Sequence, residues 1–124
     1  MVEILQGCRV VASPSSIDNA VWPTGALVLR IAPDDVLLVG AGRFEMSDPH
    51  AIVEPDGGFC AVRMSAGRVI DLLAANASWQ LPESRPCLAQ GMVAGLPVKV
   101  WVEDDWALLI SPTPFSSELE ARLL

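Results

Sequence analysis

The sequence predicts an α+β fold, in which an antiparallel or mixed sheet of repeated β-hairpins and ferredoxin-like βαβ units carries helices. Within residues 97–112, two apolar segments flank the acid pair Asp104-Asp105, which is the pattern of a hairpin. Residues 26–41 repeat that pattern around Asp34-Asp35. Residues 66–76 and 113–123 show the apolar spacing of amphipathic helices.

The likeness of the two hairpins indicates a structural repeat. Each acid pair is expected to form a solvent-exposed turn, because Asp favours turns. Superposing the acid pairs matches Val28 with Val98, Ile31 with Trp101, Val36 with Trp106 and Leu38 with Leu108. A two-residue loop at Asp104-Asp105 would place one set of alternating residues on a common face: Val98, Val100, Val102, Ala107 and Leu109.

The secondary structure of the rest of the chain is predicted from its apolar segments and from the prolines, glycines and serines that interrupt them. Residues 13–25 contain several prolines and serines and therefore predict a loop. Ser65 is the predicted N-cap of helix 66–76, and Thr113-Pro114 is the predicted start of the last helix. Gly91 lies inside a strand, as expected of a bulge or a close approach by another group. Strands are also predicted at 4–12, 50–54, 59–64 and 88–94, with a helical turn at 43–48 and a long connection at 78–86.

The length of 124 residues favours a single domain, with a strand and an irregular segment in residues 1–25. The net charge of −7 and the scattered arginines argue against nucleic-acid and anionic-membrane partners, which need clustered cations. No apolar run approaches the length of a membrane span, and the N-terminus lacks the features of a signal peptide. We therefore expect a cytoplasmic protein.

The apolar content is high for a chain of this size. Hydrophobic residues make up 52% of the sequence and the mean hydropathy is +0.42. A small domain has much surface per volume, so part of this content is expected to remain on the surface. The composition predicts either strands covered on both faces or an apolar surface that is buried by a partner or by self-association.

The cysteines give no sign of a metal site. Cys8, Cys60 and Cys87 lack the Cys-x-x-Cys spacing, and the single histidine, His50, has no neighbouring ligand. Cys60 and His50 lie on either side of a predicted turn, so a cysteine nucleophile with a histidine base is one hypothesis. The simpler expectation is three buried thiols.

Residues 26–124 resemble a known group of proteins. The run Cys87-Leu-Ala-Gln-Gly-Met-Val93, the hairpin that follows it and the terminal helix resemble the end of sarcosine oxidase gamma subunits. Ile31-Ala-Pro-Asp-Asp-Val-Leu-Leu-Val39 and the strand–helix segment 59–73 are similar to the wider aminomethyltransferase (glycine-cleavage T protein) fold group. The resemblance implies the fold of that group.

The resemblance also implies an accessory role. In the sarcosine oxidase family the flavin and folate chemistry belongs to the larger subunits, so no catalytic residue and no cofactor ligand is carried over to this chain. We expect a non-catalytic accessory subunit or interaction module that is not an enzyme by itself. It would pack against a larger oxidoreductase subunit that holds the folate or flavin.

Two sets of candidate site residues follow from these expectations. The second face of the last hairpin contains the interface candidates Trp101, Trp106, Leu108 and Ile110, together with Lys99, unless helix 66–76 or the last helix covers it. The alternative function is a homodimeric small-ligand binder of the aminomethyltransferase fold. A folate-type ligand would need an acid for its pterin ring, and the candidates are Glu54, Asp56 and Asp71.

Overall fold

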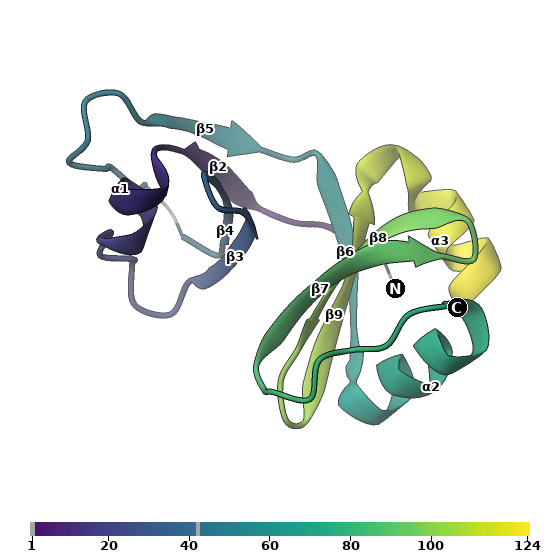
Figure 1. Cartoon of the computed structure of the whole chain (residues 1–124). Coiled ribbons are helices and arrows are strands. Elements are labelled where there is room, and N and C mark those ends of the chain that lie inside the picture. The colour runs from purple at the N-terminus through teal and green to yellow at the C-terminus, as the bar shows by residue number, and fades with distance from the viewer. Residues whose placement is uncertain (1, 42) are drawn as a thin grey trace. The chain divides into compact units, whose positions relative to one another are not determined.

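The computed structural model describes residues 2–41 and 43–124 and has an α+β architecture with two antiparallel sheets (Figure 1). The described chain forms two compact units. The first unit consists of residues 2–4 and Gly58–Leu124, and the second consists of Leu5–Gly57.

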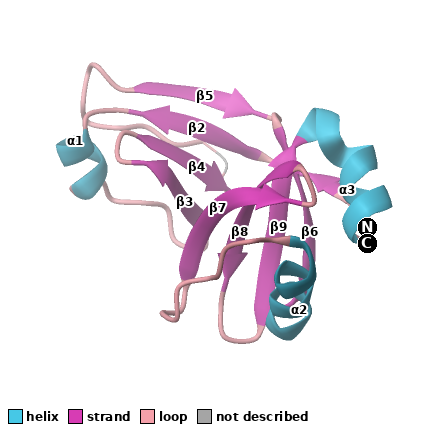
Figure 2. Ribbon diagram, turned by 45° about the vertical axis from the view of Figure 1, so that its right-hand side comes forward, coloured by secondary structure: helices cyan, strands magenta, loops and turns pink. Residues whose placement is uncertain are grey.

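The first unit is built on a five-stranded antiparallel sheet with the strand order β1-β6-β9-β8-β7 (Figure 2). Two α-helices and a short 3-10 helix complete it. Its elements are β1 (Glu3–Ile4), β6 (Phe59–Ser65), α2 (Ala66–Asn76), β7 (Cys87–Val93), β8 (Leu96–Val102), β9 (Trp106–Pro112), η1 (Thr113–Phe115) and α3 (Ser116–Leu123).

Both helices of the first unit pack on the same face of this sheet. The Ser65 hydroxyl caps α2 by accepting a hydrogen bond from the Arg68 amide at 3.1 Å, as the sequence predicted. The helices bury Val69 and Leu73 of α2 and Leu119 and Leu123 of α3 in one core. That core also contains the predicted first face of the last hairpin, namely Val98, Val100, Val102, Ala107 and Leu109. The expectation that a helix covers the opposite, tryptophan-bearing face is therefore wrong.

The connection through α2 departs from the expected βαβ unit. The sheet contains only antiparallel neighbours among the described residues, and β6 and β7, which flank α2, run in opposite directions. A βαβ unit requires parallel strands. The observed architecture is thus α+β with antiparallel sheets, without the ferredoxin-like crossover at this helix.

The second unit has a four-stranded antiparallel sheet with the order β3-β4-β2-β5. One face of this sheet and helix α1 enclose a core of Cys8, Val10, Ile17, Val36 and Leu38. Its elements are β2 (Gly7–Val11), α1 (Pro14–Asp18), β3 (Leu27–Ala32), β4 (Asp35–Val39) and β5 (Ile52–Asp56).

Two local predictions for this unit fail. Residues 13–25 were predicted as loop, but α1 begins there because Ser13 is its N-cap and Pro14 occupies the first helical turn. Ile17 then anchors this short helix by being buried in the core. Residues 43–48 were predicted as a helical turn and form no helix.

The two hairpins do not superpose on their acid pairs. In the β8–β9 hairpin the loop is Asp104-Asp105, as predicted, and the Glu103 amide donates to the Trp106 carbonyl at 2.8 Å. In the β3–β4 hairpin Ala32 pairs with Asp35, so the loop is Pro33-Asp34 and Asp35 already belongs to β4. The observed registers match Val36 with Ala107 and Leu38 with Leu109, not with Trp106 and Leu108.

The first unit is interrupted in sequence by the second. Strand β1 pairs with β6, with Glu3 opposite Ala61 and Ile4 opposite Cys60. Within the second unit, β2 and β5 are neighbouring strands, and Gly7 lies opposite Asp56. The segment that leaves the first unit after β1 therefore begins and ends on adjacent strands.

Candidate functional site

The predicted interface residues lie on the face of the five-stranded sheet that faces away from α2 and α3. We call Lys99, Trp101, Trp106, Leu108 and Ile110 the tryptophan face. Side chains of successive strand residues point to opposite sides, which is why β8 alternates between buried and half-buried positions along its length. Trp101, Trp106 and Leu108 are half-buried, whereas Ile110 is fully buried.

Both tryptophans are held by polar neighbours. The Arg63 guanidinium lies over the Trp106 ring, 4.2 Å from its centroid, in a cation–π contact. The Trp101 indole Nε1–H donates to Glu103 Oε2 at 3.2 Å. Lys99 Nζ donates to Gln90 Oε1 at 2.8 Å and lies 5.3 Å from the Phe59 ring centroid. These contacts order the aromatic side chains before any partner arrives.

The three candidate ligand acids are divided between the two units. Asp71 is an exposed residue of α2 in the first unit. Glu54 and Asp56 lie on β5 of the second unit, where Glu54 is exposed and Asp56 is engaged in an ion pair with Arg9. Asp56 is thus already paired with a cation, which it shares with Asp35.

An ion-pair cluster around Arg9 is the feature that sequence reasoning missed. Arg9 is on β2, between β4 and β5, and its guanidinium is bound by one acid from each neighbour. Its Nε donates to Asp35 Oδ1 at 2.9 Å, its Nη2 binds Asp35 Oδ2, and its Nη1 lies 3.4 Å from Asp56 Oδ2. The hydrogen bonds that Arg9 donates to Asp35 raise the pKa of Arg9, although burial opposes this shift.

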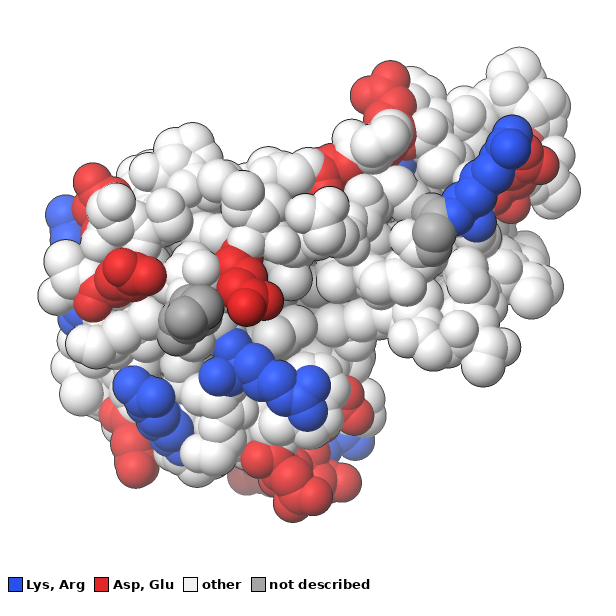
Figure 3. Space-filling view, turned by 180° about the vertical axis from the view of Figure 1, so that it is seen from behind, with Lys and Arg blue, Asp and Glu red and all other residues white. Residues whose placement is uncertain are grey.

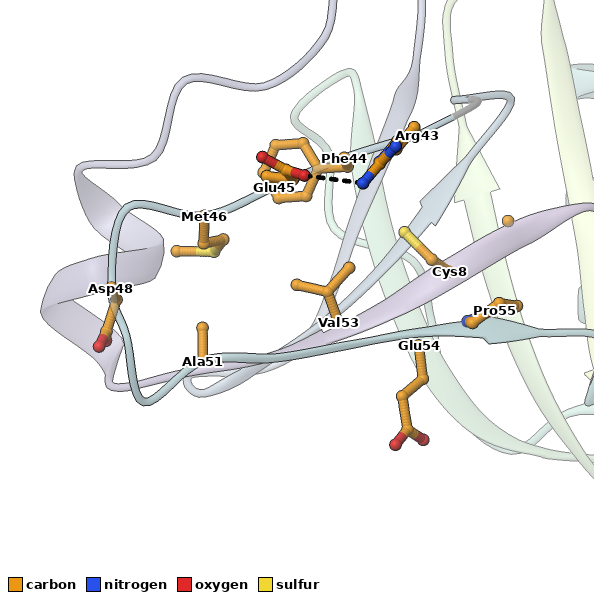
Figure 4. Close-up of a pocket in the computed structure, with 11 residues that line it drawn as sticks. Cys8, Arg43, Phe44, Glu45, Met46, Asp48, Ala51, Val53, Glu54 and Pro55 are labelled. Carbon is orange, nitrogen blue, oxygen red and sulfur yellow. Dashed lines mark ion pairs between the residues drawn. The ribbon is translucent and has the colours of Figure 1, made fainter.

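A depression of about 740 Å³ lies in the second unit, beside the segment 43–48. Figure 4 shows Cys8, Ala51 and Val53 projecting towards this segment, while Glu54 projects away on the other side of β5. Arg43 and Glu45 form an ion pair of 3.2 Å at its edge. The depression therefore has an apolar floor, with the Arg43–Glu45 ion pair and the Asp48 carboxylate at its edge, and the Glu54 carboxylate projects away from it.

The cysteines are buried, as expected. Cys60 is 1% exposed, and its thiol donates to the Ser111 carbonyl at 3.4 Å. Burial raises the pKa of both Cys60 and Cys8, because the thiolate loses its hydration. His50 belongs to the other unit and is exposed. This environment disfavours the thiolate that a nucleophilic cysteine requires.

Charged side chains of both signs share the face of the molecule shown in Figure 3. In Figure 3, acidic and basic side chains are interspersed on the face shown, consistent with the scattered arginines of the sequence. Among residues 2–41 and 43–124, no three metal-ligating side chains gather in a way that could hold an ion. No helix in the same part of the chain is long and apolar enough to cross a membrane.

Comparisons with known proteins provide no relative from which to transfer a function. No protein-family model, no curated protein and no solved structure matches the chain.

Proposed function

We propose that this chain is a non-catalytic interaction module, the accessory subunit of a larger amine oxidoreductase of the sarcosine oxidase type. The observation that carries the proposal is the tryptophan face: Trp101, Trp106 and Leu108 lie on the side of their sheet that α2 and α3 leave uncovered. Aromatic side chains of this kind are frequent anchors of protein–protein interfaces. The resemblance to gamma subunits and to the aminomethyltransferase fold group supports the choice of partner.

The two tryptophan side chains are held in fixed conformations, which favours binding. Trp106 is stacked under Arg63, and Trp101 is hydrogen-bonded to Glu103. Association costs conformational entropy when interface side chains must be immobilised, and a side chain that is already ordered loses less. The Arg63 and Lys99 cations at this face would suit a partner surface that combines apolar pockets with carboxylates.

Affinity purification with variants tests the proposal. The tagged chain is expected to retain a flavin-containing amine oxidoreductase subunit from its native cells, identified by mass spectrometry and flavin absorbance. Trp101→Ala combined with Trp106→Ala should abolish this retention, because hot-spot truncations commonly cost about 2 kcal/mol or more each. Val21→Ala removes a similarly apolar but 90% exposed side chain and serves as the matched control.

Two outcomes would contradict the proposal. One is a chain that elutes as a monomer and retains no oxidoreductase, although its circular dichroism spectrum shows that it is folded. The other is retention of the oxidoreductase at equal levels by the wild type and the double tryptophan variant. Concentration-dependent dimerisation without any other partner would instead identify the tryptophan face as a contact between two copies.

The alternative, a homodimeric binder of a folate-type ligand, has weaker support. Asp56 is paired with Arg9, and Glu54 points away from the depression beside it (Figure 4). Asp71 is fixed to the exposed side of α2. Calorimetric titration with reduced folates checks this function, and we expect no heat of binding at millimolar ligand.

The thiols provide an independent check of the non-catalytic assignment. Since burial raises the pKa of Cys60 and Cys8, the native thiols should react with a disulfide reagent more slowly than thiols of the chain in urea. For Cys60 and Cys8 the lower reaction rate should persist from neutral to mildly alkaline pH, because burial raises the pKa of both thiols above that of an ordinary thiol. A native thiol that reacts fast at pH 6–7 would indicate an activated nucleophile.

A further inference from the structure

A second candidate site lies in the first unit, between α2 and the connection that follows it. A groove of about 480 Å³ runs along the second half of α2 and along residues 77–85. Pockets of several hundred Å³ with mostly apolar walls and few polar groups are the usual setting of small-ligand sites. The apolar walls come from Ile70, Leu73, Ala74, Ala77, Trp79 and Leu81.

Trp79 is a fixed wall of this groove. Its indole Nε1–H donates to the Met92 carbonyl of β7 at 2.9 Å. The ring lies so close to the strand that a Cβ atom on Gly91 would be 2.5 Å from Trp79 Nε1. Gly91 thus permits the docking of the indole, which explains the glycine inside β7 without a bulge in its register. The wall is formed before a ligand binds.

Arg85 supplies an oriented cation at the same groove. Its Nη1 donates to the Pro82 carbonyl at 2.5 Å and to the Ser84 carbonyl at 3.0 Å, and it lies 3.6 Å from Cys87 Sγ. These contacts hold the guanidinium in place. Its Nε and Nη2 have no hydrogen-bond partner among the described residues, so two donor nitrogens with three N–H groups are left over. A planar guanidinium with two spare donors suits a carboxylate, which can accept both.

We propose that this groove binds a small organic carboxylate, with its apolar body against Trp79 and α2 and its carboxylate on Arg85. A single negative charge is favoured over a dianion such as phosphate, because Glu83 lines the same groove and the chain carries a net charge of −7. An apolar body of about the size of a phenyl ring fits walls made of aliphatic side chains and one indole. This site is independent of the tryptophan face.

Three probes with the same body separate the contributions of shape and charge. The probes are 3-phenylpropanoate, 3-phenylpropan-1-ol and 3-phenylpropan-1-amine, each titrated into the ¹⁵N-labelled chain and followed by NMR. The acid should shift the Trp79 indole signal at low millimolar concentration and bind roughly fivefold more tightly than the alcohol, the size of a partly exposed ion pair. The amine should bind more weakly than the alcohol.

Two variants test the assignment to these residues. Arg85→Gln should reduce the affinity for the acid to that for the alcohol. Ala74→Leu should fill the groove and weaken all three probes, whereas Ala75→Leu, on an exposed neighbouring position outside the groove, should leave them unchanged. Equal binding of acid and alcohol, preference for the amine, or no shift of the Trp79 signal would each overturn the proposal. These measurements use the chain alone, so they do not depend on whether it binds an oxidoreductase partner.

Discussion

In the β8–β9 hairpin, Asp104 and Asp105 both lie in the loop, whereas in the β3–β4 hairpin the loop is Pro33-Asp34 and Asp35 is the first residue of β4. The same dipeptide is therefore a turn in one hairpin and half turn, half strand in the other. In the first case the carboxylates are exposed. In the second, Asp35 is bound to Arg9.

The difference has a local cause. Pro33 fixes its own φ near the value required at the second position of a turn, which draws the loop one residue towards the N-terminus. The β3–β4 register then shifts between Arg30 and Ala32, which restores the pairing of the remaining apolar residues. A shift of one residue turns a strand side chain to the other face, so the position of a turn decides what a carboxylate can reach.

The largest expected effect in comparing the two hairpins is the loss of stability when a core leucine is truncated. Leu109 and Leu38 occupy equivalent, fully buried positions in the observed registers. Leu109→Ala and Leu38→Ala should each destabilise their own unit by about 2–5 kcal/mol, as measured by hydrogen exchange of that unit's strand amides. Leu108→Ala, at the half-buried position that the acid pairs would have matched with Leu38, should cost about 1 kcal/mol.

A Leu38→Ala variant that resembles Leu108→Ala more closely than Leu109→Ala would break the comparison. That result would mean that equivalent positions of the two hairpins are found by aligning their acid pairs and not by aligning their observed strand registers.

The next test concerns the acids themselves. Asp35→Asn removes the charge that neutralises Arg9, and we expect a loss of about 1–2 kcal/mol in urea unfolding, discounted because the pair is partly exposed. Asp105→Asn should change stability by no more than about 0.5 kcal/mol. The cost of Asp35→Asn should shrink in molar salt, since exposed ion pairs are screened. Equal effects of the two substitutions would show that Asp35, too, is only a turn residue.

The smallest expected effect is at the third tight loop, between β7 and β8. Ala94 and Gly95 form a two-residue loop with φ of 49° and 81°, a combination that favours Asn-Gly. Ala94→Asn should therefore stabilise the first unit by about 0.5–1 kcal/mol, measured as a rise of the urea midpoint, because Asn adopts the left-handed region at a lower cost than Ala. Asp105→Gly should give no gain, because neither loop aspartate has a positive φ. A gain from Asp105→Gly would contradict this assignment of turn types.

The parts of the fold that depend on local chemistry were predictable. Helix α2 begins and ends where its Ser65 cap and its apolar spacing indicate. The same kind of signal, Ser13-Pro14, precedes α1, but one turn of helix with the single apolar anchor Ile17 shows no periodicity that would predict it. The division into two sheets depends on the pairing of β2 with β5, which are distant in sequence.

The candidate sites, too, could be predicted only where they depend on residues close together in the sequence. The tryptophan face could be predicted, since alternation along one hairpin places Trp101 and Trp106 on a common side. The Arg9 cluster could not, because it depends on the registers of β2 with β4 and with β5, which no local pattern predicts. At the groove, Gly91 indicated the close approach of another group but did not identify that group as Trp79.

The interruption of the first unit after β1 has a consequence for the polymer physics of folding. Pairing β1 with β6 requires closing a loop that contains all of Leu5–Gly57, and an unstructured loop of that length opposes closure entropically. The pairing of Gly7 with Asp56 brings the ends of that loop together once the second sheet has formed. Folding of the second unit thus lowers the entropic cost of pairing β1 with β6. A short turn in its place should let β1 and β6 meet as a simple hairpin.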